Sequence, residues 1–76
     1  MSREDFNETL SSFCKRAPFR PFVVELSSGA LITVKHPEAM LIRGGVAVYA
    51  SVHEEISIID AVSVTRIMDT AAEVRA

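Results

Sequence analysis

Two short segments of this sequence combine a histidine with acidic residues, which are side-chain types that bind metal ions or transfer protons. One segment is His53-Glu54-Glu55, and the other is Lys35-His36-Pro37-Glu38. Neighbouring side chains of an extended chain point in opposite directions, so the first segment does not gather its groups on one face. We expect a solvated turn there and a loop histidine at His36, satisfied by water or backbone. A site at His36 with Lys35 and Glu38 is the alternative.

Cys14 is the only cysteine of the chain. The cations of Lys15 and Arg16 beside it would favour the thiolate, but its place on an apolar stripe predicts a small buried residue. A lone cysteine forms no internal disulfide and no zinc site, which is compatible with a reducing cytosol. Because the sequence contains no paired nucleophile and base, no metal-ligand set and no phosphate loop, we expect a non-enzymatic protein without catalytic residues, metal or cofactor.

Few residues are suited to nucleic acids. Tyr49 with Arg43, and His36 with Lys35, are the pairs that could stack on a base and contact a phosphate. The formal net charge of -2 and the pI of about 5.6 argue against a general affinity for phosphate backbones, which requires many cationic side chains. RNA is therefore the alternative partner, and Lys35, His36, Arg43 and Tyr49 are its candidate contacts.

The apolar content favours self-association. Of the 76 residues 49% are hydrophobic, and the mean hydropathy is +0.26. A chain this short buries only about 60% of its unfolded surface on folding, so a sheet edge covered by a second copy would add apolar area. Asp60 and Arg66 flank a corner and could pair within the chain or across a subunit boundary. The expected interface residues of the homo-oligomer are Ile56, Ile58, Asp60, Val64 and Arg66.

The N-terminal segment has the pattern of an amphipathic helix over about residues 3–16. Ser2 is a suitable N-cap, with Asp5 three residues later. An apolar stripe at helical spacing consists of Phe6, Leu10, Phe13 and Cys14. We expect this stripe to cover the core and the helix to end before Pro18, where a stiff Pro-Phe-Arg-Pro-Phe connector begins.

The clearest strand pattern is a β-hairpin over residues 22–36, where two β-branched runs alternate with period two around a Ser-Ser-Gly turn. A plain two-residue loop would pair Leu26 with Leu31. One extra loop residue, with Gly29 at positive φ, would pair Leu26 with Ile32 instead. We favour the longer loop, because it places apolar side chains opposite apolar side chains.

The remaining chain alternates short apolar runs with turns. The strands are expected at about 22–27, 30–36, 40–43, 46–51, 55–60 and 64–68, with two of them merging into one bent strand. Gly44-Gly45 predicts a second tight turn, and Ala61-Val62-Ser63 predicts a single helical turn or a sharp corner. In the strand at 46–51, Tyr49 alternates with a more apolar face, so we expect it to point outward or toward a partner.

The helix and five strongly bent antiparallel strands predict a mostly β (α+β) single domain over 1–76, closed into a small barrel because a flat sheet would expose two edges. This element order resembles the Sm and Sm-like family, as does the segment Ile58–Ile67, in which a short turn separates the last two strands. The resemblance implies an Sm-like or SH3-like barrel and a ring of subunits joined fourth strand to fifth. Of the family's base-binding residues before and within the third strand, only Met40 matches. The chain is also similar to small uncharacterised bacterial proteins that share its segments at 18–22 and 36–38.

The N-terminus lacks a secretory signal, and no apolar run approaches the roughly 20 residues of a membrane span, so we expect a cytoplasmic protein. No small-molecule substrate is indicated. The sequence predicts a self-associating, non-enzymatic interaction or scaffold module, and an Sm-like RNA-binding ring is the alternative.

Overall fold

The computed structural model describes residues 1–51 and 55–69. Its elements, in chain order, are α1 (Arg3–Lys15), β1 (Phe22–Leu26), β2 (Leu31–Val34), the 3₁₀ turn η1 (Pro37–Ala39), β3 (Met40–Arg43), β4 (Val46–Ala50), β5 (Ile56–Asp60), the 3₁₀ turn η2 (Ala61–Ser63) and β6 (Val64–Asp69). The fold is α+β, with one helix followed by six short antiparallel strands.

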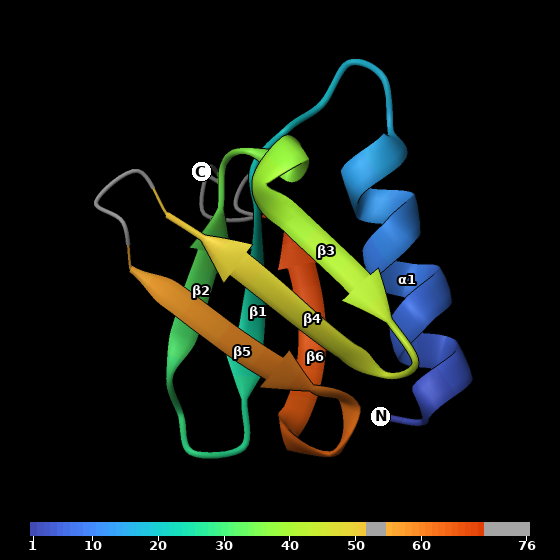
Figure 1. Cartoon of the computed structure of the whole chain (residues 1–76), viewed down its shortest axis with the longest axis vertical. Coiled ribbons are helices and arrows are strands. Elements are labelled where there is room, and N and C mark those ends of the chain that lie inside the picture. The colour runs from blue at the N-terminus through green and yellow to red at the C-terminus, as the bar shows by residue number, and fades with distance from the viewer. Residues whose placement is uncertain (52–54, 70–76) are drawn as a thin grey trace.

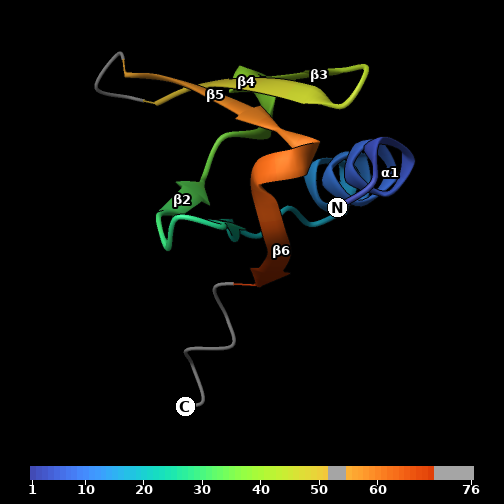
Figure 2. The same cartoon turned by 90° about the horizontal axis from the view of Figure 1, so that it is seen from below.

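The strands form two separate three-stranded sheets with the orders β2-β1-β6 and β3-β4-β5. The prediction of one bent five-stranded sheet closed into a barrel is therefore wrong. The turns η1 and η2 each carry the chain from one sheet to the other, where the prediction placed a continuous bent sheet. In Figure 1 the β3-β4-β5 strands run diagonally across the other sheet, and Figure 2 shows the two sheets as separate layers.

The helix begins as the sequence predicts. The Ser2 hydroxyl accepts a hydrogen bond from the Asp5 backbone N–H at 3.0 Å, which satisfies one of the free donors of the first turn. Phe6 and Leu10 are completely buried, and Phe13 and Cys14 pack against the core from a partly buried position. The stripe thus covers the core, and α1 closes one side of the space between the two sheets (Figure 2).

The first hairpin has a different register from both sequence alternatives. Its loop contains three residues: the Leu26 N–H donates to the Ala30 carbonyl, and the Gly29 N–H donates to the Leu26 carbonyl, both at 2.9 Å. Gly29 adopts the expected positive φ, at 95°. The pairing is Val24 opposite Ile32, two residues away from the predicted one. A shift of two keeps every side chain on its face, so apolar residues still oppose each other.

The β4 strand faces the opposite way from the prediction. Ala47 is fully buried and Tyr49 is only 4% exposed, so the tyrosine points into the core and not outward. Its hydroxyl accepts a hydrogen bond from the Lys35 N–H at 3.1 Å, just after the end of β2. The large ring thus fills space between the sheets while its polar tip has a partner. Val46 consequently lies on the outer side.

The segment between α1 and β1 is held by aromatic and cationic contacts. The Phe22 ring lies 5.0 Å from the Phe13 ring and 6.1 Å from the Phe19 ring, measured between centroids. The Arg16 guanidinium lies 4.7 Å from the Phe13 centroid and donates to the Arg20 carbonyl at 2.9 Å. These contacts fix the connector against the end of the helix. Within the described ranges, no helix has the length and apolarity that crossing a membrane requires.

Candidate functional site

Among the residues that the structure describes, histidine and acidic side chains do not assemble a buried reaction centre. His36 Nδ1 lies 3.5 Å from Glu38 Oε2; the His36 side chain is 43% exposed and the Glu38 side chain 74%. Lys35 is exposed beside them. Among residues 1–51 and 55–69, no three His, Cys, Asp or Glu side chains are grouped so that they could hold a metal ion. His53 and Glu54 lie outside the described residues.

Cys14 has the environment of a core residue. It is half-buried on the inner side of α1, and burial raises the pKa of its thiol above the ordinary value. The neighbouring Lys15 and Arg16 do not produce the opposite shift. The expectation of a small packed residue is therefore confirmed, and the thiol is a weaker nucleophile at neutral pH than a free cysteine.

The four candidate RNA contacts do not form one surface. Lys35 and His36 lie just before η1, at the start of the path into β3, whereas Arg43 is the last residue of β3. Tyr49 packs in the core, and its ring is not available for stacking on a base. Arg43 is exposed, and within the described part of the chain its side chain has no ion-pair partner.

The predicted interface residues lie in unlike environments. Ile56 and Ile58 are exposed on β5, whereas Val64 is buried at the start of β6. Asp60 and Arg66 do not pair within the chain. The Asp60 Oδ1 accepts a hydrogen bond from the Ser63 N–H at 2.9 Å and caps η2, while Arg66 Nε pairs with Glu25 Oε1 across the β1–β6 ladder.

The outer side of the β3-β4-β5 sheet is the most apolar exposed region of the described chain. Ile58 is 73% exposed, Leu41 74% and Ile56 69%. Strand pairing places Leu41, Val48 and Ile58 in one row across the three strands. The surface called here the outer apolar face consists of Leu41, Val46, Val48, Ala50, Ile56 and Ile58.

Charged groups occur at one end of this face. The row next to Leu41, Val48 and Ile58 contains Arg43 on β3, Val46 on β4 and Asp60 on β5. The two charges therefore occupy opposite edges of the same row, with a valine between them. Neighbouring strands lie about 4.8 Å apart, so the Cα atoms of Arg43 and Asp60 are separated by roughly 10 Å.

The outer side of the other sheet differs in chemistry. There Glu25 lies between Leu31 and Arg66, and the glutamate and arginine form an ion pair on the surface. Leu31 is an exposed leucine on an edge strand, as Leu41 is, but its cross-strand neighbour is a carboxylate in place of a valine. Among the described residues, only the β3-β4-β5 sheet thus carries a row of aliphatic side chains across all three strands on its outer side, with the two outermost ones exposed.

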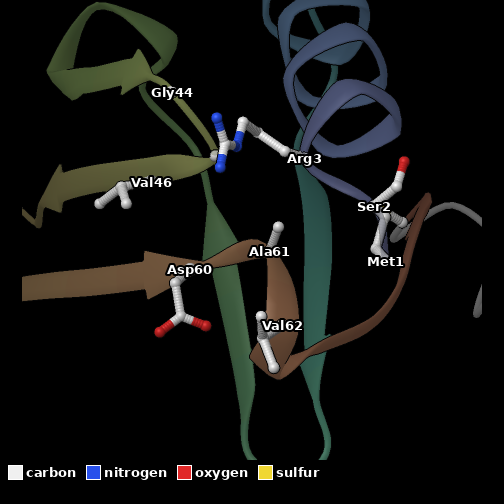
Figure 3. A pocket seen from close by; sticks show the side chains of 9 residues that line it. Met1, Ser2, Arg3, Gly44, Val46, Asp60, Ala61 and Val62 are labelled. Carbon is white, nitrogen blue, oxygen red and sulfur yellow. The ribbon is translucent and has the colours of Figure 1, made fainter.

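An open hollow of about 470 Å³ lies at the charged end of the outer apolar face. The first turn of α1, the β3–β4 turn and η2 surround it. Figure 3 shows Arg3 reaching from α1 toward Gly44 and the start of β4, while the Asp60 carboxylate points away from Arg3. Among the side chains that line the hollow, Arg3 carries a positive charge and Asp60 a negative charge, and the two do not pair. The charges of the hollow therefore do not select one class of ligand.

No protein-family model matches the chain, and no curated protein or solved structure is significantly similar to it. The structure supports the coarse part of the Sm resemblance, which is an N-terminal helix followed by short antiparallel strands, but it identifies no family.

Sequence reasoning identified one edge of the outer apolar face and missed the rest. Ile56 and Ile58 were expected at an interface, but Leu41, Val46 and Val48 were not. The available signal was the apolar composition of β4 and of the first three residues of β3, which indicates strands with apolar groups on both sides. Apolar residues on both sides of β4 indicate that its second side also needs a covering partner.

Proposed function

We propose that this protein is a non-enzymatic interaction module that self-associates through the outer apolar face. The observation that supports the proposal is the row of Leu41, Val48 and Ile58, which runs across a complete sheet with its two outermost side chains largely exposed. Contiguous apolar patches of this kind mark interaction sites on soluble proteins, because their hydration is unfavourable.

The gain from covering this face is substantial for a small domain. Burying one exposed leucine or isoleucine side chain contributes about 1.5–3 kcal/mol before the costs of association are subtracted. Leu41, Ile56 and Ile58 are each more than two-thirds exposed. Their combined burial would be comparable with the whole stability of many small domains.

The occupant that best fits this face is a second copy of the chain. The face has an apolar centre, and a cation and a carboxylate stand at opposite edges of one row, so it can be complementary to itself. Self-complementary patches are the basis of two-fold dimers. Three strands of four or five residues cover roughly 14 by 17 Å, which is small beside a standard interface of about 800 Å² per partner. We therefore expect a dimer that dissociates on dilution.

The test is the native mass over a range of protein concentrations, measured by light scattering and sedimentation. We expect the mass to rise from 8.3 kDa toward twice that value as concentration increases. Leu41→Lys should raise the dissociation constant at least about tenfold, because it buries an unpaired ammonium group. Leu31→Lys is the matched control, since it replaces an exposed leucine on the other sheet.

Two outcomes would overturn the proposal. One is a monomer at every concentration up to about the millimolar range, where even weak specific contacts are populated. The other is an equal effect of Leu41→Lys and Leu31→Lys, which would show that the outer apolar face has no special role. Thermal unfolding of each variant confirms that the substitutions leave the fold intact.

A further inference from the structure

This inference rests on the proposed function and specifies the contact. We propose that two copies pack face to face about a two-fold axis parallel to β4, so that Arg43 of each copy pairs with the partner's Asp60. The sheet order β3-β4-β5 places β4 in the middle, with Arg43 on one edge strand and Asp60 on the other. A rotation about the central strand therefore exchanges the two charged edges.

The strand register determines which residues meet under this rotation. Arg43, Val46 and Asp60 share one row, so Arg43 comes to lie over the partner's Asp60 and Val46 over its own counterpart. In the next row Leu41 comes to lie over the partner's Ile58, and Val48 over its own counterpart. Aligned sheets pack about 10 Å apart with strands within roughly 30° of each other, which keeps both rows matched.

Other arrangements of the same face match the charges less well. A two-fold axis across the strands would place Arg43 and Asp60 over the opposite end of the partner's sheet, where Ala50 and Ile56 lie. Both charges would then be buried against apolar groups, which is costly. Pairing of two β5 edges would extend the sheet but leave Leu41 and Arg43 uncovered on the far strand β3.

Both charged groups are available for an intermolecular pair. In residues 1–51 and 55–69 the Arg43 side chain has no hydrogen-bond or ion-pair partner, and Asp60 uses Oδ1 to cap η2 without pairing with a cation. Arg3, the cationic side chain drawn in Figure 3, extends toward Gly44 and not toward the Asp60 carboxylate. The pair would therefore form without breaking an existing one.

The first experiment locates the axis by cross-linking. In a Cys14→Ala background, single cysteines are introduced as Val48→Cys, Leu41→Cys and Ile58→Cys and treated with a short bis-maleimide. The proposed axis predicts efficient cross-linking of Val48→Cys with itself, and of Leu41→Cys with Ile58→Cys when the two proteins are mixed. Leu41→Cys alone and Ile58→Cys alone should react slowly, because each lies about two strand spacings from its own counterpart.

The second experiment tests the charges by a double-mutant cycle on the dimer dissociation constant. Asp60→Asn keeps the Oδ1 acceptor that caps η2 and removes only the charge. We expect Arg43→Gln and Asp60→Asn each to weaken the dimer about three- to tenfold, as for two exposed ion pairs, and the double variant to weaken it no further. Lys35→Gln, which removes an exposed cation away from the face, should have no effect.

The outcomes separate this inference from the proposed function. Efficient self-cross-linking of Ile58→Cys without Val48→Cys would indicate β5 edge pairing and overturn the two-fold axis along β4, while leaving self-association intact. If Arg43→Gln and Asp60→Asn had additive effects on the dissociation constant, or no effect, the Arg43–Asp60 pair would be overturned. Self-association itself would again remain intact. A monomer at all concentrations would instead remove the proposed function itself.

Discussion

Arg16 Nη2 lies 2.5 Å from Asp69 Oδ1, and this ion pair joins the end of α1 to the end of β6. Arg16 also donates to the Arg20 carbonyl and packs on the Phe13 ring. One side chain therefore connects the helix, the connector and the last described strand.

Stability should depend on pH through Asp69. The hydrogen bond from Arg16 lowers the pKa of this carboxyl below its ordinary value, and the nearby charges of Arg16 and Arg20 lower it further. A folded-state pKa that is depressed adds stability above the unfolded pKa of about 4, and that stability is lost as pH falls through the folded value. We expect urea unfolding between pH about 2 and 5 to show this loss. Asp69→Asn should flatten the dependence of the unfolding free energy on pH. An unchanged dependence would show that Asp69 does not cause the loss of stability.

Removal of the Tyr49 hydroxyl should destabilise the protein without changing its fold. Tyr49→Phe leaves the Lys35 N–H without its acceptor, which costs about 1 kcal/mol in the free energy of unfolding. Tyr49→Leu, which also removes much of the buried ring, should cost more. Chemical denaturation measures both, and equal stability of all three proteins would mean that Tyr49 does not pack in the core.

The two glycines of the β3–β4 turn should respond differently to alanine. Both adopt positive φ, so each substitution carries a backbone cost of about 1 kcal/mol. A Cβ at Gly45 would also lie 2.6 Å from Arg3 Cγ, whereas a Cβ at Gly44 meets no atom within 4 Å. We expect Gly45→Ala to be the more destabilising variant in thermal unfolding. Adding Arg3→Ala should recover the difference, and failure to do so would contradict the steric explanation.

Cys14 should react slowly with alkylating reagents in the folded protein. The thiolate is the reactive form, and burial raises the pKa of this thiol. At pH about 7.5 we expect iodoacetamide to modify the native protein more slowly than the urea-unfolded chain. Mass spectrometry measures the rates, and equal rates would mean that Cys14 is not shielded by α1 and the core.

Local features of the fold could be predicted from sequence because local physics determines them. The Ser2 cap, the Phe6 and Leu10 stripe and the positive φ of Gly29 each depend on residues within a few positions. The predicted helical turn after Asp60 is also confirmed as η2, because Asp60 itself accepts the capping hydrogen bond. Such features need no knowledge of the rest of the chain.

Features that depend on distant segments were predicted poorly. The alternation of β1 and β2 fits registers two residues apart equally well, and the position of the three-residue loop, at 27–29 in place of the predicted 28–30, decides between them. The orientation of β4 depends on Tyr49 reaching the Lys35 N–H, a contact that no pattern within β4 reveals. The same holds for sheet organisation, because β1 pairs with β6 across most of the described chain. For the candidate site, the sequence showed that β3 and β4 are rich in apolar residues, but it did not show which side of these strands faces outward.

The order in which the two layers can form follows from their connections. The β3-β4-β5 sheet is made of consecutive strands, so its pairings close short loops and cost little chain entropy. The other sheet has β1 between β2 and β6, and its last partner is synthesised at the far end of the chain. During synthesis on the ribosome, one edge of β1 therefore remains unpaired until β6 has emerged. Unpaired strand edges favour aggregation, so β1 is the strand most exposed to wrong pairing until β6 has been synthesised.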